Sequence, residues 1–229
     1  MEICRLEHIR KDYRMGELVT PLKDLSLTVN AGDFITVEGP SGIGKSTLLY
    51  IMGAMLQCDS GSYRFEEKDV FAMSDNERSE LRAEKIGFLF QEPTMLQALT
   101  LRENLLFSQR IGKSAKTDRV QADALLRRFG LEDRADFFPH QLSGGQRRRA
   151  MAARLLLHTP RLILADEPTN DLDEHWSLEI IDSLREAAEQ GAGVVMVTHN
   201  TQWAQQANRR CRLEDGTLSD IVQATSEIR

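Results

Sequence analysis

The stretch that decides the fold is FITVEGPSGIGKSTLLYIMGAML, residues 34–56. Its beginning, Phe34 to Gly39, has the apolar residues of a strand, and Ser46 to Leu56 has the three-to-four apolar spacing of a helix. The loop between them, GPSGIGKS at residues 39–46, matches the pattern G-x-x-x-x-G-K-S in the context that phosphate binding requires. A chance glycine-rich turn is the weaker alternative because strand, loop and helix all agree.

This loop carries groups that suit the phosphates of a nucleotide and a Mg²⁺ ion. Gly42 and Gly44 let the backbone curl so that its N–H groups point at phosphate oxygens, and the following helix adds its positive end. Lys45 can bridge the β- and γ-phosphates, the Ser46 hydroxyl suits Mg²⁺, and Thr47 can add a hydrogen bond to phosphate. The predicted nucleotide-binding residues of the loop are Gly39, Pro40, Ser41, Gly42, Ile43, Gly44, Lys45, Ser46 and Thr47.

Strands and helices alternate along the rest of the chain. Upstream, LSLTV at residues 25–29 alternates like a strand and reaches Phe34 through a tight turn. Downstream, the pattern predicts strands at 61–65, 86–91, 162–166 and 194–199, helices between 100 and 157, and a helix at 174–190. The last two strands are apolar throughout, which is typical of a buried parallel sheet.

The order of these elements predicts one α/β domain of the phosphate-loop NTPase class over residues 1–229. We expect a mixed, mainly parallel sheet in a core of about residues 1–91 and 160–229, with an antiparallel β region near the N-terminus. An inserted helical subdomain is expected at about residues 92–159.

Two carboxylates follow the strand LILAD, residues 162–166. Asp166 stands at the carboxyl edge of the predicted sheet, where α/β folds place their ligands, and can hold Mg²⁺ through water. Glu167 can orient a water molecule and accept its proton as the water attacks the γ-phosphorus. A solvated strand end is an equal interpretation of the pair alone, but the phosphate loop upstream favours the catalytic one.

The pentapeptide LSGGQ, residues 142–146, predicts an open helix start. Ser143 can cap the helix, while Gly144 and Gly145 leave its N–H groups uncovered for an anion. With this motif ahead of LILADEPTNDLD, residues 162–173, nearly the whole chain resembles the ABC ATPase family. The resemblance implies a RecA-like core and a homodimer that buries two ATP molecules head to tail. The residues Ser143, Gly144, Gly145 and Gln146 would then meet the γ-phosphate held by the opposite subunit.

Four further residues match the family one at a time. Gln91 resembles the glutamine that touches Mg²⁺ and senses the partner, so the implied Mg²⁺ ligands are Ser46, Gln91 and Asp166. Asp173 resembles the residue that crosses the dimer interface, and His199 resembles the histidine that contacts the γ-phosphate. Tyr13 resembles the aromatic residue that stacks on adenine. The implied catalytic residues are Glu167, His199 and Gln91. Taken alone, Asp173 or His199 could be an ordinary loop residue, and Tyr13 could be core or surface filler.

Two segments indicate a subfamily. GELVTPLKDLSLTV at 16–29 and MSDNERSELRAEKIGFLFQ at 73–91 are similar to the lipoprotein-releasing, macrolide-exporting and cell-division ATPases. That resemblance implies transmembrane permease subunits as partners and a cycle of export, lipoprotein release or mechanical relay. The sequence departs from the family at TNDLD, residues 169–173, and at EPTMLQALTLREN, residues 92–104, where a permease would dock.

Composition and charge limit the partners and the compartment. The net charge of −6 argues against non-specific attraction to nucleic acid, and the three cysteines are too scattered for a disulfide framework. No apolar stretch approaches the roughly 18–20 residues of a membrane span, and no signal-peptide core is evident. We expect a cytoplasmic chain held on the inner face of the membrane through the permease.

Other functions stay open as alternatives. The run Arg147 to Arg149 could contact nucleic acid, but consecutive helical residues point in different directions, so a solvated face or a contact with a neighbouring subdomain is preferred. A soluble ABC ATPase acting on ribosomes or DNA usually carries two ATPase domains, a coiled-coil insertion or zinc modules, which the sequence lacks. A kinase or GTPase would not need LSGGQ.

Overall fold

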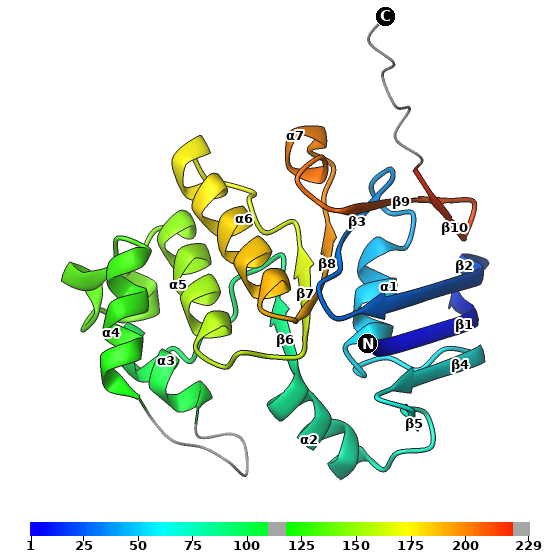
Figure 1. The fold of residues 1–229 in the computed structure, drawn as a ribbon, viewed down its shortest axis with the longest axis horizontal. Helices are drawn as coiled ribbons and strands as arrows, with labels where there is room; N and C mark the ends of the chain where they lie inside the picture. Colours follow the sequence, from blue (N-terminus) through cyan, green and yellow to red (C-terminus); the bar gives the residue numbers. More distant parts are fainter. Residues whose placement is uncertain (110–117, 222–229) are drawn as a thin grey trace, which may run out of the picture.

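The centre of the molecule is a six-stranded sheet (Figure 1). The computed structural model describes residues 1–109 and 118–221. Along the sheet the order is β10, β9, β3, β8, β7, β6, and all neighbours pair in parallel except β10 with β9. The bounds are β3 Phe34–Glu38, β6 Ile86–Leu89, β7 Leu162–Asp166, β8 Gly193–Val197, β9 Arg209–Glu214 and β10 Thr217–Asp220.

Both faces of this sheet are buried at its centre, where strand β8 has no polar side chain and is buried at every position. On β8, Val194 and Met196 pack in one hydrophobic cluster, while Val195 and Val197 pack in the other. The first cluster includes α6 (Glu174–Glu189), and the second includes α1 (Lys45–Met52). This alternation confirms the expected parallel core.

A second, antiparallel sheet covers α1 from the other side (Figure 1). Its order is β2, β1, β4, β5, with the bounds β1 Glu2–Met15, β2 Glu17–Asn30, β4 Ser60–Phe65 and β5 Lys68–Asp69. The expected tight turn joins β2 to β3, since Asp33 N donates to the Asn30 carbonyl at 3.1 Å. The two strands nevertheless enter different sheets, so α1 lies between two β layers.

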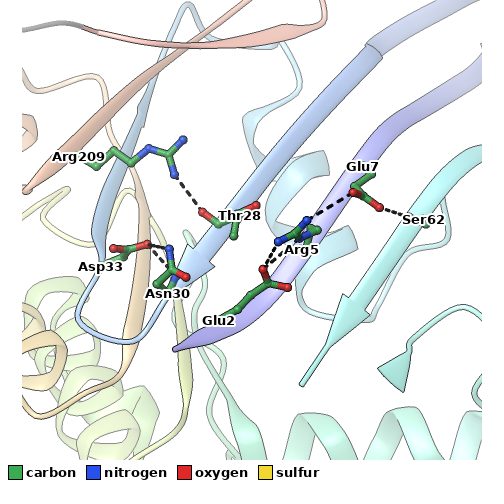
Figure 2. A network of polar contacts seen from close by, with 8 residues as sticks. All are labelled: Glu2, Arg5, Glu7, Thr28, Asn30, Asp33, Ser62 and Arg209. Atoms are coloured by element: carbon green, nitrogen blue, oxygen red, sulfur yellow. Dashed lines mark hydrogen bonds and ion pairs between the residues drawn. The ribbon is translucent and has the colours of Figure 1, made fainter. Parts of the chain in front are cut away.

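Polar side chains tie the two sheets together at one end (Figure 2). Arg209 Nη1 on β9 donates to the Thr28 carbonyl on β2 at 3.0 Å, and its Nε pairs with Asp220 at 2.9 Å. Within the antiparallel sheet, Ser62 Oγ on β4 donates to Glu7 Oε2 on β1 at 3.2 Å. Of these three contacts, only the one between Arg209 and the Thr28 carbonyl links the two sheets that enclose α1.

Most helices gather on the side of the sheet away from the antiparallel layer (Figure 1). Helix α2 (Asp75–Lys85) is an exception, since its Leu81 packs against the hydrophobic cluster that includes α1. The other bounds are α3 Leu101–Ser108, α4 Arg119–Arg128, α5 Gly144–Leu156 and α7 Thr201–Ala204, with 3-10 turns at Glu132–Arg134 and Pro139–Gln141. Capping boxes begin α2, α3 and α5 at Ser74, Thr100 and Ser143. Across residues 1–109 and 118–221, no helix is long and apolar enough to cross a bilayer.

Most elements predicted from the sequence are present, with shifts at their ends. The first helix ends at Met52 rather than Leu56, with Gly53 as its C-cap. The sequence did not predict six elements, which are short or mix charged and apolar residues: β1, β5, β9, β10, α2 and α7. The three cysteines are free, as expected. The end of the predicted helical stretch at Arg110 lies outside the described residues.

The Tyr63 hydroxyl connects the antiparallel sheet to α1 and should stabilise the fold. Tyr63 is fully buried and its hydroxyl donates to the Met52 carbonyl at 2.6 Å. Tyr63→Phe leaves that carbonyl without its partner, so we expect the free energy of unfolding to fall by about 1–2 kcal/mol in urea denaturation. The control Tyr50→Phe, at an exposed tyrosine on α1, should change the free energy of unfolding by less than about 0.5 kcal/mol. Equal changes would contradict this role.

Candidate active site

The phosphate loop connects β3 to α1 with its lysine turned inward. Gly42 and Gly44 have φ values of +77° and +116°, in the region that favours glycine. A Cβ at Gly44 would lie 2.8 Å from the Pro21 Cβ, so the close approach of β2 also requires glycine there. Lys45 Nζ donates to the carbonyls of Gly39 and Pro40 at 2.7 and 2.8 Å. The ammonium therefore lies inside the loop curve, where a phosphate would be bound.

Asp166 and Ser46 form an oxygen-rich pair beside the loop. Asp166 is only 3% exposed, and burial raises the pKa of its carboxyl above the ordinary value of 3.8. The hydrogen bond from Ser46 opposes that rise, the neighbouring Glu167 charge adds to it, and the Lys45 charge lowers the pKa. A carboxylate and a hydroxyl are the hard oxygen donors that Mg²⁺ prefers, so these side chains fit that ion.

The rest of the coordination of Mg²⁺ would have to come from outside the protein. Among residues 1–109 and 118–221, no group of three or more His, Cys, Asp and Glu side chains could hold a metal ion. Phosphate oxygens and water usually supply most Mg²⁺ ligands in nucleotide sites, which agrees with this sparse set. Gln91 follows β6 with an exposed side chain, and its contact with Mg²⁺ stays a prediction.

Glu167 and His199 are brought together by the adjacent strands β7 and β8. His199 Nδ1 lies 2.8 Å from Glu167 Oε1, and the His199 backbone N–H donates to the same oxygen at 3.1 Å. An ionised carboxylate only accepts, so the Nδ1 carries a proton in this contact. The Glu167 side chain is 11% exposed and that of His199 is 65% exposed. The pair can therefore present a fixed carboxylate and an accessible imidazole to a ligand in the phosphate loop.

The backbone at Glu167 is in an unusual conformation. Its φ of +47° is in the left-handed region, which costs a residue with a side chain about 1–3 kcal/mol. The Glu167 N–H donates to the Val197 carbonyl at 3.0 Å, which anchors this residue to the end of β8. Strain of this kind is often found at active sites, where surrounding contacts hold it in place.

Tyr13 reaches the start of α1 from the first strand. Its hydroxyl lies 3.5 Å from Thr47 Oγ1, and the Lys11 ammonium lies 5.6 Å from the centre of its ring. The long β1–β2 hairpin, with Val19 opposite Tyr13, carries the ring to the phosphate loop. An aromatic ring in this place suits stacking with a nucleotide base, which stays a prediction.

The residues 143–146 of the LSGGQ pentapeptide lie at the start of α5, apart from the phosphate loop. Ser143 Oγ accepts from Gln146 N at 3.2 Å, and Gln146 Oε1 accepts from Ser143 N at 2.9 Å. Gly144 is exposed, and a Cβ added there would meet nothing within 4 Å. Within the part of the chain that the structure describes, no hydrogen bond or ion pair joins residues 143–146 to residues 39–47. One chain thus leaves the start of α5 open. Asp173, the other residue expected at a dimer interface, caps α6 by accepting from Trp176 N at 3.0 Å.

One interpretation of the sequence was that the run Arg147 to Arg149 forms a solvated helix face. This interpretation is wrong for Arg148 and Arg149. Arg148 and Arg149 are buried, because they follow the helical spacing of the core-facing residues Met151 and Ala152. Arg149 Nη1 donates to the Phe129 carbonyl at 2.5 Å, and its guanidinium lies 3.9 Å from the centre of the Trp176 ring. The alternative interpretation, a contact with neighbouring elements, describes both side chains. Their helical position was the signal in the sequence that could have identified them.

This fold and this site define a phosphate-loop protein of the α/β class, with a buried carboxylate after β7 and a capped, glycine-rich helix start held apart from the phosphate loop. The model of the ABC transporter family matches residues 22–170. The chain therefore belongs to the ABC transporter family.

Similar proteins agree with this assignment. The chain is 40% identical over 95% of its length to the macrolide export ATP-binding/permease protein MacB of Syntrophobacter fumaroxidans, and 39% identical over 94% to that of Shigella flexneri. It covers 31% and 34% of those relatives, so it spans about a third of their length. A solved dimer of the ATP-binding cassette MJ0796, in a post-hydrolysis state with ADP and Pi, matches with a TM-score of 0.90. That match is 33% identical and covers 97% of this chain and 100% of the cassette.

Asp166→Asn should stabilise the protein in the absence of nucleotide and Mg²⁺. The pKa of Asp166 is raised in the folded state, so its ionised form destabilises the fold above the ordinary pKa, and this effect disappears as the pH falls below it. Near neutral pH we expect the melting temperature to rise by about 2–4 °C, with the gain fading toward about pH 4. Calorimetry across pH measures this, with the exposed Asp133→Asn as a control that should show no gain. A gain that grows in acid would contradict it.

Proposed function

We propose that this chain binds MgATP, pairs with a second copy of itself and hydrolyses the ATP to drive a membrane permease. The observation that carries the proposal is the Glu167 carboxylate, held 2.8 Å from His199 Nδ1 and next in sequence to Asp166. It adjoins the phosphate loop through the Asp166–Ser46 hydrogen bond. A strained, buried carboxylate in this position suits the activation of a water molecule.

Each residue of the site has a role in the proposed binding step. Tyr13 stacks on the base, the backbone and Lys45 of the phosphate loop hold the phosphates, and Ser46, Asp166 and Gln91 hold Mg²⁺. To bind a phosphate, Lys45 Nζ exchanges its contacts with the Gly39 and Pro40 carbonyls for phosphate oxygens. Mg²⁺, when bound, neutralises charge that develops on the phosphate oxygens.

The second copy completes the site. Its residues Ser143, Gly144, Gly145 and Gln146 form a capped helix start, at which the backbone N–H groups of Gly144 and Gly145 are offered to an anion. Asp173, which lies on an exposed turn, approaches the same interface. The dimeric state of the MJ0796 cassette, which shares the fold over 97% of this chain, supports this arrangement. Glu167 then takes a proton from the attacking water while His199 contacts the γ-phosphate.

A groove of about 350 Å³ suits the permease. It runs between β6, α2, α3 and α5, and its lining includes the apolar side chains of Phe88, Phe90, Leu96 and Phe107. Leu96 and Phe107 are exposed although they are large and apolar, which marks a contact surface. The names of the relatives join ATP binding to a permease and to export. We therefore propose that the chain works on the cytoplasmic side of a membrane. We also propose that it is divided into a RecA-like core of about residues 1–91 and 160–229 and a helical subdomain of about residues 92–159.

Glu167→Gln should bind ATP, accumulate as an ATP-bound dimer and turn over at least about 10³-fold more slowly, because the amide cannot accept the proton of the attacking water. Phosphate release at saturating MgATP measures turnover, and size-exclusion chromatography with and without ATP measures pairing. The variant Glu174→Gln, at an exposed carboxylate on the first turn of α6, is the control and should keep its turnover. Turnover of Glu167→Gln near that of the control would remove Glu167 from the proposed role.

The permease is tested by affinity capture of Glu167→Gln with MgATP from detergent-solubilised native cells, followed by mass spectrometry. A polytopic membrane protein should be recovered in stoichiometric amount. Adding Phe107→Glu, in the groove, should abolish its recovery, because a buried charge in an apolar contact is unfavourable. Adding Val120→Glu, at an exposed position outside the groove lining, should leave it unchanged. Recovery of ribosomes or DNA-repair proteins alone would contradict the permease.

A further inference from the structure

The Arg148 guanidinium lies between two segments of the site, the one after β6 and the turn after β7. It is 7% exposed and extends from α5, five residues after Ser143. Its Nη1 donates to the Glu167 carbonyl at 3.0 Å, and its Nη2 donates to the Gln91 carbonyl at 2.9 Å. The same Nη2 lies 3.5 Å from the Asp171 carboxylate. One planar side chain thus contacts the segment after β6 and both ends of the turn after β7.

The turn that Arg148 holds is conformationally strained at both contact points. Glu167 and Asp171 have φ values of +47° and +60°, which residues other than glycine rarely adopt. The peptide plane whose oxygen Arg148 binds follows the Cα of Glu167, so its orientation helps to set the direction of the Glu167 side chain. The Glu167 N–H is fixed to the Val197 carbonyl on the other side. Arg148 and β8 therefore hold this residue from its two ends.

Arg148 is a costly way to fill this position. Burial lowers the pKa of its guanidinium, against the opposing effect of the Asp171 charge, and its buried Nε finds no hydrogen-bond partner. A buried charge that is only partly satisfied destabilises a fold, and an apolar side chain would avoid that cost. The rigid fork of arginine is, however, the side chain that can bind two carbonyls at a fixed spacing.

We propose that Arg148 is a positioning residue for hydrolysis, which fixes the Glu167 backbone against the Gln91 backbone so that the carboxylate faces the attacking water. The inference rests on the proposed role of Glu167 as the base. Gln91 precedes residues 92–104, several of which line the groove, and Arg148 belongs to α5, which begins after Ser143. A shift of residues 92–104 or of α5 would therefore change the position of Glu167. Arg148 makes no hydrogen bond or ion pair with residues 39–47, which hold the phosphates, so its loss should affect turnover more than nucleotide binding.

Arg148→Lys tests the proposal by separating turnover from binding. Lysine keeps the charge, but a single ammonium cannot bind both carbonyls in the geometry of the guanidinium. We expect kcat for ATP hydrolysis to fall by about 10²-fold, the effect of a misplacement of about 1 Å in a catalytic group. The affinity for MgATP, measured by calorimetry with Glu167→Gln also present, should stay within about threefold.

Arg149→Lys is the matched control. Arg149 is the neighbouring buried arginine, and its guanidinium contacts Phe129 and Trp176 rather than Glu167 and Gln91. The control should lose melting temperature to a similar degree and keep kcat within about threefold. If Arg148→Lys melts below the assay temperature, Arg148→Gln takes its place, because its neutral amide removes the buried charge. Full kcat in the folded Arg148 variant, or an equal loss of kcat in Arg149→Lys, would overturn the proposal. Undiminished turnover of Glu167→Gln would instead overturn the proposed function.

Discussion

The burial of both faces of the parallel sheet is the constraint on which the rest of the molecule depends. Strands β3, β7 and β8 are buried at four or five consecutive positions, so they fold only if other elements cover them on both sides. Parallel pairing places their carboxyl ends at one edge of the sheet. The phosphate loop, the Asp166–Glu167 turn and His199 follow those three ends, which is why they meet.

Function at this edge depends on charges that the fold holds at some expense of stability. Asp166 is buried with a raised pKa, Lys45 is turned toward backbone carbonyls, and Glu167 has a strained backbone. The burial of Asp166 and the backbone conformation of Glu167 both lower stability, and in the proposed function these carboxylates meet Mg²⁺ and water. The dense packing of α1 and α6 against the two faces of the sheet provides the stability that offsets them.

The molecule offers two surfaces that a single chain leaves uncovered. The open start of α5 has the chemistry of an anion site, and the groove beside β6 has the apolar character of a protein contact. Arg148 connects the elements behind them, since its helix begins at the first surface and its Gln91 contact borders the second. This connection gives a physical route by which occupation of one surface can alter the carboxylate beside the phosphate loop.

The sequence alone determined the phosphate loop, the central strands and the carboxylates at the strand end, because each depends on the spacing of nearby residues. It also placed Ser143 on a cap and Arg148 on a helix. Only the tertiary structure decided that β2 and β3 enter different sheets, that Tyr13 reaches Thr47 across 34 positions, and that Arg148 is buried against Gln91 and Glu167. These features depend on contacts between distant segments, whose free energy comes from packing the whole core rather than from any local pattern.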